Sequence, residues 1–271
     1  GTGDLIPEFA VLLQGSLFAR VKDVVSNSGF GSPKFSAGIN PVALLALDDI
    51  GGGVGPELAV VGRNSSNGRV QAQIKDVASG ALVRTISFNK PFEPFAAAVV
   101  DNVGDSAAQE IAVLGIDAGG RIQAQVIDSM TGVQISKFKF DKNFTPLAFA
   151  AVPNTGGRLK YLAVLGINAS GVIQAQIRRA ANGSQIGKIK FAKAYAPKAF
   201  LSFVDSNGSG GGEITVVGVN GSGAIRAQTR EIEDGSSVTN ITFNKKYPLV
   251  DAIAVNGVAG TGRNEIAVLG Q

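Results

Sequence analysis

One short sequence phrase recurs along the chain, and this periodicity constrains the fold more than any other feature. The copies are EFAVLLQ from Glu8, ELAVVGR from Glu57, EIAVLGI from Glu110, YLAVLGI from Tyr161, EITVVGV from Glu213 and EIAVLGQ from Glu265. The steps between copies are 49, 53, 51, 52 and 52 residues. A repeat in this range indicates an array of similar structural units.

Each unit contains the same four strand-like segments. The phrase is followed by a polar turn and a strand around Gln-Ala-Gln, such as RIQAQVID. A hairpin turn comes next, in which an X-Gly pair supplies the positive φ that a tight turn needs. The pairs are Ser79-Gly80, Thr131-Gly132, Asn182-Gly183 and Asp234-Gly235. A strand ending in Phe, a loop and an apolar strand such as FAAAVVD complete the unit. No helical pattern interrupts this order.

Repeated antiparallel units of four short strands predict an all-β fold, a β-propeller. Its innermost strands should be covered on both faces, which suits the apolar runs PVALLAL, FAAAVV and LAFAAV. A stacked solenoid is the alternative, although solenoids usually have shorter repeats or helices.

The repeat count predicts five four-stranded blades of about 50 residues in a single domain, 1–271. Repeats start near 8, 57, 110, 161 and 213, with a partial sixth copy at 265–271. One blade should be shared between the chain ends, with strand 1 near 250–257 and strands 3 and 4 from SLFARVKDVV and the segment around Phe35. Both 8–13 and 265–270 could supply its strand 2. We expect a closed monomer with one surplus strand; a domain-swapped assembly is the alternative.

Composition excludes several functions. The chain has neither Cys nor His, which rules out disulfides, cysteine nucleophiles and Ser-His-Asp triads. The net charge of +4 comes without basic clusters, so no nucleic-acid partner is expected. Apolar runs are strand-sized, so no membrane span is expected. An exported location (secreted, periplasmic or cell surface) fits a cysteine-free chain.

The Asp/Gly-rich turn that precedes an acidic residue and "AVLG" resembles the FG-GAP (VCBS, integrin α-like) propeller repeats. The resemblance covers nearly the whole chain, but its loops are degenerate. The best match is DSNGSGGGEITVVG, where the resemblance implies a Ca²⁺ site at Asp205, Asn207, Ser209 and Glu213; oxygen ligands are those that Ca²⁺ prefers. The other loops have lost most of these residues, and a Gly-rich turn is the simpler interpretation for them. A hairpin resembling quinoprotein blades lacks their Trp, so no quinone cofactor is expected.

A second repeated motif suggests a ligand-binding rim. The loops FNKPFEP, FDKNFTP, FAKAYAP and FNKKYP place a lysine and an aromatic residue at equivalent positions. These residues are Lys90, Phe92, Lys142, Phe144, Lys193, Tyr195, Lys245 and Tyr247. They could attract and stack an anionic ligand. Alternatively, the aromatics form a plug between blades, with the lysine stems lying over it.

The Gln residues of the third strand alternate with apolar residues: Gln71/Gln73, Gln123/Gln125 and Gln174/Gln176. A buried amide must find hydrogen bonds, so we expect them to bond between blades or to backbone.

The sequence favours a non-enzymatic binding or adhesion module that recognises a glycan or a protein through loops on one face. The alternative is a polysaccharide-acting enzyme of the lyase type, for which Lys, Tyr, Arg or carboxylates would have to act as acid and base. No two carboxylates stand out as a pair in the sequence. A purely structural or engineered repeat scaffold is a third possibility.

Overall fold

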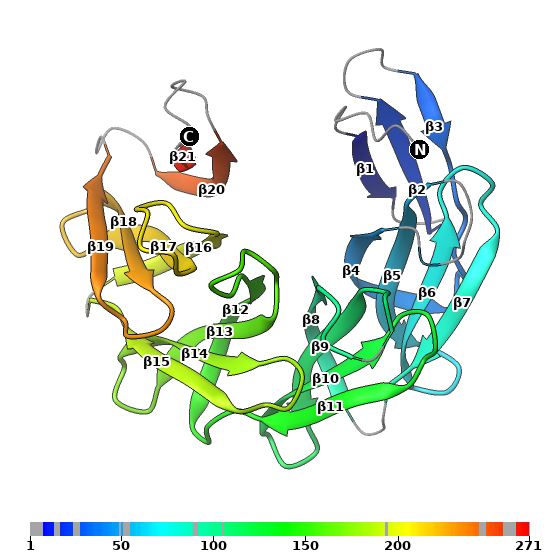
Figure 1. The fold of residues 1–271 in the computed structure, drawn as a ribbon, viewed down its shortest axis with the longest axis horizontal. Coiled ribbons are helices and arrows are strands. Elements are labelled where there is room, and N and C mark those ends of the chain that lie inside the picture. Colours follow the sequence, from blue (N-terminus) through cyan, green and yellow to red (C-terminus); the bar gives the residue numbers. More distant parts are fainter. Residues whose placement is uncertain are drawn as a thin grey trace. The chain divides into compact units, whose positions relative to one another are not determined.

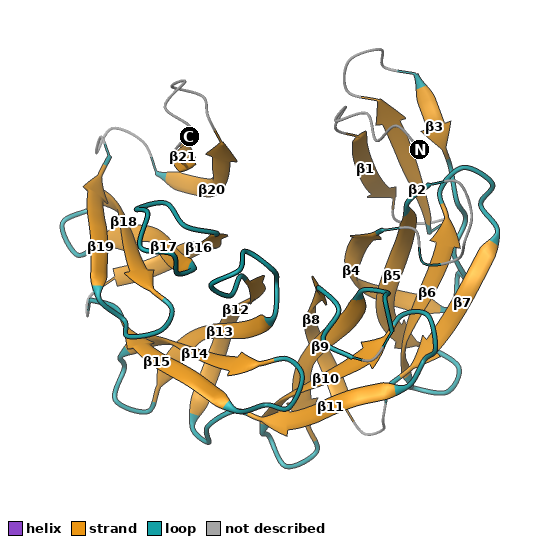
Figure 2. Cartoon of the chain, in the orientation of Figure 1, coloured by secondary structure: helices purple, strands orange, loops and turns teal. Residues whose placement is uncertain are grey.

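The computed structural model describes residues 8–13, 17–23, 28–48, 50, 55–88, 92–104, 106–192, 195–243, 248–256 and 264–270. In these residues every regular element is a β-strand (Figure 2). The chain divides into two compact units, Gly1–Gly120 with Gln125–Ile135, and Arg121–Ala124 with Ser136–Gln271.

The first unit begins with a three-stranded sheet in the order β1-β2-β3, made of β1 (Glu8–Leu13), β2 (Phe18–Asp23) and β3 (Gly29–Gly31). A four-stranded sheet follows in chain order, made of β4 (Ile39–Leu47), β5 (Glu57–Asn64), β6 (Val70–Asp76) and β7 (Leu82–Ser87). The next sheet contains β8 (Phe92–Val100), β9 (Glu110–Asp117), β10 (Ile122–Asp128) and β11 (Gln134–Lys139). The boundary between the units passes through β10 and β11 (Figure 1).

The second unit continues the pattern. One four-stranded sheet is made of β12 (Phe144–Val152), β13 (Tyr161–Asn168), β14 (Ile173–Arg179) and β15 (Gln185–Lys190). The next is made of β16 (Tyr195–Phe203), β17 (Glu213–Asn220), β18 (Ile225–Glu231) and β19 (Ser237–Thr242). A two-stranded sheet of β20 (Leu249–Asn256) and β21 (Asn264–Gly270) ends the described chain. The predicted succession of four-stranded antiparallel units is confirmed for these four complete sheets.

The predicted hairpin glycines are confirmed. Gly80, Gly132, Gly183 and Gly235 have φ between +69° and +74°, a region that glycine enters at no steric cost. Each donates its N–H to the carbonyl of the residue four positions earlier, at 2.8–3.1 Å. These bonds close the turn between the third and fourth strands of each sheet.

Burial differs from the expectation for the innermost strands. In β8 and β12 most side chains are only half-buried, and Phe95 and Leu147 are 38% and 40% exposed. The expectation that these apolar strands are covered on both faces is therefore wrong. Each is the edge strand of its sheet. Full burial belongs to the phrase strands β5, β9, β13 and β17, whose first six residues are all buried.

The strand segments predicted near both chain ends are present, but they form two separate sheets, β1-β2-β3 and β20-β21, and the predicted shared blade stays a prediction. The strands predicted in SLFARVKDVV and near 250–257 are β2 and β20. The strand expected around Phe35 starts earlier, since the partner of β2 is β3 and the pairing continues only as a bridge between Phe18 and Lys34. The Phe35 N–H then donates to the Leu17 carbonyl at 2.8 Å.

Candidate functional site

The aromatic residues of the predicted rim are buried where the structure describes them. Phe92, Phe144 and Tyr195 open β8, β12 and β16 and are only 6–7% exposed. The Tyr195 hydroxyl donates to the Val216 carbonyl at 2.8 Å, and burial raises the pKa of this phenol. These contacts match the structural interpretation of the aromatics as packing residues.

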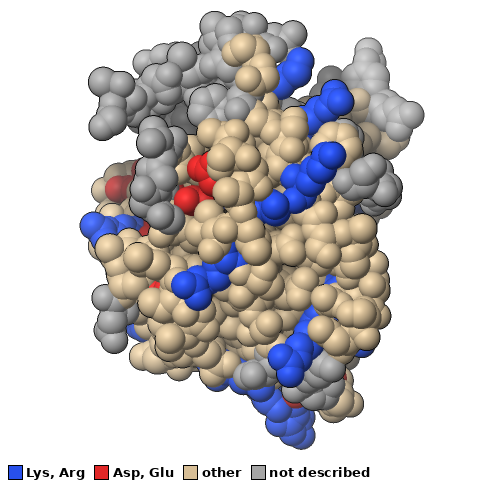
Figure 3. Space-filling view, turned by 90° about the vertical axis from the view of Figure 1, so that its right-hand side faces the viewer, with Lys and Arg blue, Asp and Glu red and all other residues tan. Residues whose placement is uncertain are grey.

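The lysines of the rim are only partly described. Lys142 is exposed on the loop between β11 and β12. Lys90, Lys193, Lys245 and Tyr247 lie outside the described residues. On the face drawn in Figure 3, Lys and Arg side chains lie apart from one another on a mostly uncharged surface. The rim therefore stays a prediction.

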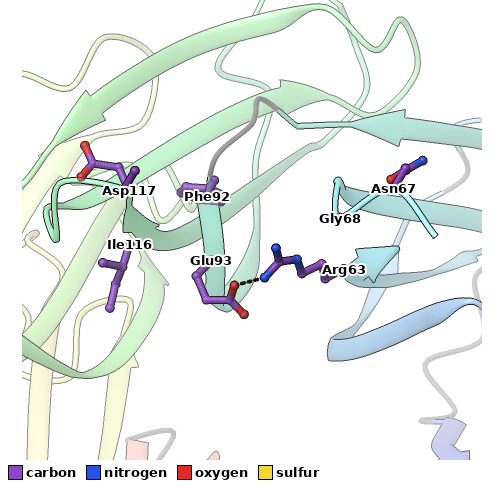
Figure 4. A pocket seen from close by; sticks show the side chains of 8 residues that line it. Arg63, Asn67, Gly68, Phe92, Glu93, Ile116 and Asp117 are labelled. Carbon is purple, nitrogen blue, oxygen red and sulfur yellow. Dashed lines mark hydrogen bonds and ion pairs between the residues drawn. The ribbon is translucent and has the colours of Figure 1, made fainter. Parts of the chain in front are cut away.

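A groove in the first unit lies on the face predicted to carry the ligand. Its volume is about 350 Å³, and it is lined by Arg63, Asn67, Gly68, Phe92, Glu93, Ile116, Asp117 and Ala118. Figure 4 shows its construction: one side comes from the end of β5 and its turn, the other from the end of β9, and Phe92 and Glu93 of β8 lie between them. Only Phe92 was among the predicted site residues.

The polar centre of the groove is an ion pair. The Arg63 guanidinium pairs with the Glu93 carboxylate (Figure 4). The side chains are 46% and 63% exposed, and a pair this exposed contributes little to stability. Its donors and acceptors are accessible to a ligand.

This ion pair breaks the repeat symmetry. In the other three complete sheets, the positions equivalent to Arg63 carry Ile116, Ile167 and Val219, and those equivalent to Glu93 carry Asn40, Thr145 and Ala196. Sequence reasoning missed both residues, because it compared the residues that the repeats share. The signal was present in the differences between repeats.

Local hydrogen bonds fix the two turns that border the groove. The side-chain oxygen Oδ1 of Asn64 accepts from the Ser66 N–H at 2.9 Å, and Oδ1 of Asp117 accepts from the Gly119 N–H at 2.9 Å. Such Asx turns hold a tight loop in one conformation. Asn67 follows the first turn, and its own Oδ1 accepts from the Arg69 N–H at 2.8 Å.

The acidic residue of the phrase has a role that the sequence did not reveal. Glu57, Glu110 and Glu213 are at most 1% exposed, and each accepts hydrogen bonds from the Gly-rich loop that precedes it. The donors are the N–H groups of Ile50 for Glu57, Val103 and Gly104 for Glu110, and Ser206 for Glu213, at 2.8–3.0 Å. The carboxylate therefore fastens the loop to the start of the strand.

The candidate calcium loop is held in the same way. Asp205 accepts from the Gly210 N–H at 3.1 Å, while Asn207 and Ser209 donate to Glu231 at 2.6 and 3.0 Å. The described residues contain no cluster of three or more acidic side chains suited to a metal ion. Because the loop oxygens already bond to the protein, this arrangement does not fit a calcium shell. Binding would require the loop to rearrange, and the site stays a prediction.

The structure brings carboxylates together across neighbouring strands. Glu213 lies directly opposite Glu231, and Glu57 opposite Asp76. These pairs are not apparent in the sequence, because 18 or 19 residues separate the partners. Burial, with a smaller contribution from Glu231, raises the pKa of Glu213 although Ser206 hydrogen bonds oppose the shift.

The equivalent position in the third complete sheet shows a compensating change. Tyr161 replaces the glutamate and lies opposite Arg179. The Arg179 guanidinium lies 5.4 Å from the centre of the Tyr161 ring, within the range of a cation–π contact. In this sheet Asn154 holds the preceding loop, since its Oδ1 accepts from the Gly156 and Arg158 N–H groups at 3.1 and 3.0 Å.

Comparison with known proteins identifies the fold. A WD40 domain from Toxoplasma gondii coronin matches with a TM-score of 0.63 and 9% identity, over 97% of this chain and 63% of that domain. A chain in the crystal structure of BBS1N in complex with ARL6DN matches with a TM-score of 0.64 and 15% identity, over 97% of this chain and 72% of that chain. The fold is of the β-propeller type.

A further propeller neighbour is also known as a complex. The structure of KlAtg21 with the coiled-coil of AgAtg16 matches with a TM-score of 0.55 and 11% identity, over 88% of this chain and 68% of that chain. At these identities the likeness extends to the fold alone. No family model matches the sequence, and no curated protein matches it. In the described part of the chain, no helix could span a membrane.

Proposed function

We propose that this propeller is a non-enzymatic interaction module that binds a protein partner through the groove around Arg63 and Glu93. The main support for this proposal is the Arg63–Glu93 ion pair, which interrupts the repeat symmetry. In the three other complete sheets the position of Arg63 carries an aliphatic side chain, whereas this groove presents a guanidinium donor beside a carboxylate acceptor.

The chemistry of the groove suits an extended polypeptide segment. Arg63 offers N–H donors, Glu93 offers acceptor oxygens, and the apolar Ile116 side chain is 36% exposed beside them. A peptide supplies both carbonyl acceptors and N–H donors, together with side chains for an apolar surface. Two neighbours with the same fold, BBS1N and KlAtg21, were solved as complexes with other proteins, which supports this class of ligand.

We propose a ring of five blades in a single domain, in which β20 and the β2–β3 segment contribute to one shared blade. The glutamate that begins five of the six copies of the phrase supports the proposed membership of the FG-GAP repeat group. We also propose an exported location and, as a second ligand surface, the lysine rim on the same face.

A matched pair of variants tests the groove. Arg63→Ile and Glu93→Thr together install the residues that other repeats carry at these positions, so the fold should be retained. The labelled chain and this double variant would be applied to a peptide library and to a glycan array. We expect peptide hits for the parent chain and at least a tenfold loss of affinity for the variant.

The control is Ile167→Val, which changes the position equivalent to Arg63 in another sheet and should leave binding unchanged. Equal binding by the parent and the double variant would exclude the groove as the site. Hits confined to glycans would overturn the choice of a protein partner. Binding lost instead on Lys142→Ser would move the site to the lysine rim.

A further inference from the structure

The sixth residue of every complete phrase strand is glycine, and the structure shows why. Gly62, Gly115, Gly166 and Gly218 each lie opposite a proline of the preceding strand. A Cβ added at any of them would overlap the carbonyl oxygen of the residue before that proline: Asn40, Glu93, Thr145 or Ala196. The register shifts just after each proline, so the bulged first strand accepts only glycine at this position.

The two terminal copies of the phrase differ at this position. Counted from Glu265, the sixth residue of the last copy is Gly270, which lies opposite Leu249 beside the same kind of register shift. Counted from Glu8, the sixth residue of the first copy is Leu13. β21 therefore pairs with a bulged first strand in the usual way, whereas β1 carries a side chain where that pairing requires none.

β21 also lacks a neighbour that its counterparts have. In the complete sheets the phrase strand is paired on both sides, but the sheet of β20 and β21 ends at β21 among the described residues. Leu269 is 61% exposed, whereas Leu114 and Leu165, at the equivalent position, are at most 1% exposed. An exposed apolar edge of this kind favours addition of another strand.

The repeat itself identifies which strand fits this edge. In the sheet that begins with β4, the phrase strand β5 pairs with the third strand β6. Glu57 then lies opposite Asp76, and Val61 lies opposite Ala72. β1 and β2 pair in the same register, with Glu8 opposite Asp23 and Leu12 opposite Ala19. β2 is therefore the third strand of a sheet, and β1 and β21 are two candidates for the same edge of it.

We propose that β21 of the same chain displaces β1 from β2 and completes the shared blade. In this proposal β1 pairs with the edge of β2 only until β21 binds there. This inference rests on the proposed ring closure and decides which of the two strands closes it. The expected register places Leu269 opposite Ala19 and Val268 opposite Arg20. The displaced β1 fits the position next to β20 less well, because Leu13 stands where the phrase strands of the four complete sheets have glycine against a bulged first strand.

Cysteine pairs test the choice of strand, since the chain has no cysteine of its own. One variant combines Ala19→Cys with Leu269→Cys, and its competitor combines Ala19→Cys with Leu12→Cys. Arg20→Cys with Val268→Cys or with Val11→Cys provides a second set, because neighbouring antiparallel pairs alternate in their spacing. Each protein would be oxidised at low concentration and examined on non-reducing gels and by mass spectrometry.

We expect an intrachain disulfide in most molecules of at least one β2–β21 variant and in few molecules of the β2–β1 variants. Disulfides formed only between β2 and β1 would overturn the inference. If light scattering still showed a compact monomer, closure itself would survive that result. Disulfides between chains in the β2–β21 variants would instead assign the edge to a second copy and overturn closure within one chain.

Exchange of the two residues provides an independent test. In the Ala19→Cys/Leu269→Cys background, Gly270→Leu should reduce the intrachain disulfide at least fivefold. In the Ala19→Cys/Leu12→Cys background, Leu13→Gly with Gly270→Leu should increase it. Circular dichroism of each variant reports folding separately. Unchanged yields in folded variants would show that glycine does not decide between the strands.

Discussion

The side-chain oxygen of Gln176 accepts a hydrogen bond of 3.1 Å from the backbone N–H of Asp141. Gln176 is buried in β14, and Asp141 lies in the loop between β11 and β12. The equivalent Gln73 accepts from the Ser36 N–H at 2.9 Å, and Gln228 from the Ala192 N–H at 3.1 Å. Each of these glutamines bonds to the backbone of the loop that leads into its own sheet, which agrees with the backbone bonding predicted for the Gln-Ala-Gln motif.

Removing this link should weaken the fold. Gln176→Ala leaves the Asp141 N–H without its acceptor and creates a cavity, so we expect a loss of about 2–3 kcal/mol in unfolding free energy. Urea unfolding followed by circular dichroism would measure it. The control is Gln185→Ala, an exposed residue of β15, which should change stability by less than about 0.5 kcal/mol. Equal effects of the two variants would contradict the role of the link.

Removing the Glu110 carboxylate, which holds the preceding loop by hydrogen bonds, should also lower the free energy of unfolding. Glu110→Ala removes the acceptor of the Val103 and Gly104 N–H groups, and we expect about 1–3 kcal/mol of destabilisation because these donors lose their partner. Hydrogen exchange at Val103 and Gly104 should accelerate more than exchange in β10. Glu233→Gln is the control, since Glu233 is exposed. Unchanged exchange in the loop would argue against the anchor.

Two buried carboxyl groups predict opposite pH dependence. The pKa of Glu213 is raised, mainly by burial, so the folded state binds this proton more tightly than the unfolded state does. The contribution of protonated Glu213 to the free energy of unfolding therefore falls as pH rises from the unfolded pKa through the folded pKa. Burial also acts on Asp128, but hydrogen bonds from Ser106, Thr131 and Met130 outweigh it and lower the pKa of that carboxyl. Its contribution is present above the unfolded pKa and is lost as pH falls through the folded pKa.

The corresponding amides separate these contributions. Above about pH 4.5 ionisation of Glu213 should destabilise the parent chain, and Glu213→Gln should not show this loss. Above about pH 4 the ionised Asp128 should stabilise the parent chain, and Asp128→Asn should lack this stabilisation. Unfolding free energies measured between about pH 3 and 7 would show the two differences. Parallel pH profiles for the two variants would contradict the assignment.

The close approach of Gly218 to Ala196 predicts that a side chain at position 218 destabilises the fold. Gly218→Ala places a Cβ against the Ala196 carbonyl oxygen, and we expect about 1–3 kcal/mol of destabilisation from the overlap. Gly221→Ala is the matched control, since nothing lies within 4 Å of a Cβ there. Thermal unfolding of both variants would compare them, and similar melting temperatures would exclude the steric explanation.

The loop at 205–213 should not depend on calcium in the arrangement described. Because its oxygens accept hydrogen bonds from the protein, we expect the same melting temperature in Ca²⁺ and in chelator. Differential scanning fluorimetry would measure both. A higher melting temperature in Ca²⁺ that disappears in Asp205→Ala would instead establish the site implied by the FG-GAP resemblance.

The sequence alone determined the repeating unit and its strands. Periodicity located the phrase strands, and X-Gly pairs located the hairpins, because both signals depend on residues a few positions apart. It failed for the innermost strands, where apolar composition suggested burial on both faces. The apolar run of β8 suited the first strand of a sheet, but it could not show that the Phe95 side chain would be 38% exposed.

Only the tertiary structure decided the candidate sites. Arg63 and Glu93 are 30 residues apart in sequence, and the differences between repeats do not show that their side chains pair. Glu213 and Glu231 meet only because two strands pair in one register. The need for glycine at position 218 likewise comes from the backbone of another strand, the Ala196 carbonyl. Local patterns specify strands and turns, whereas sites depend on the register and packing that bring distant side chains together.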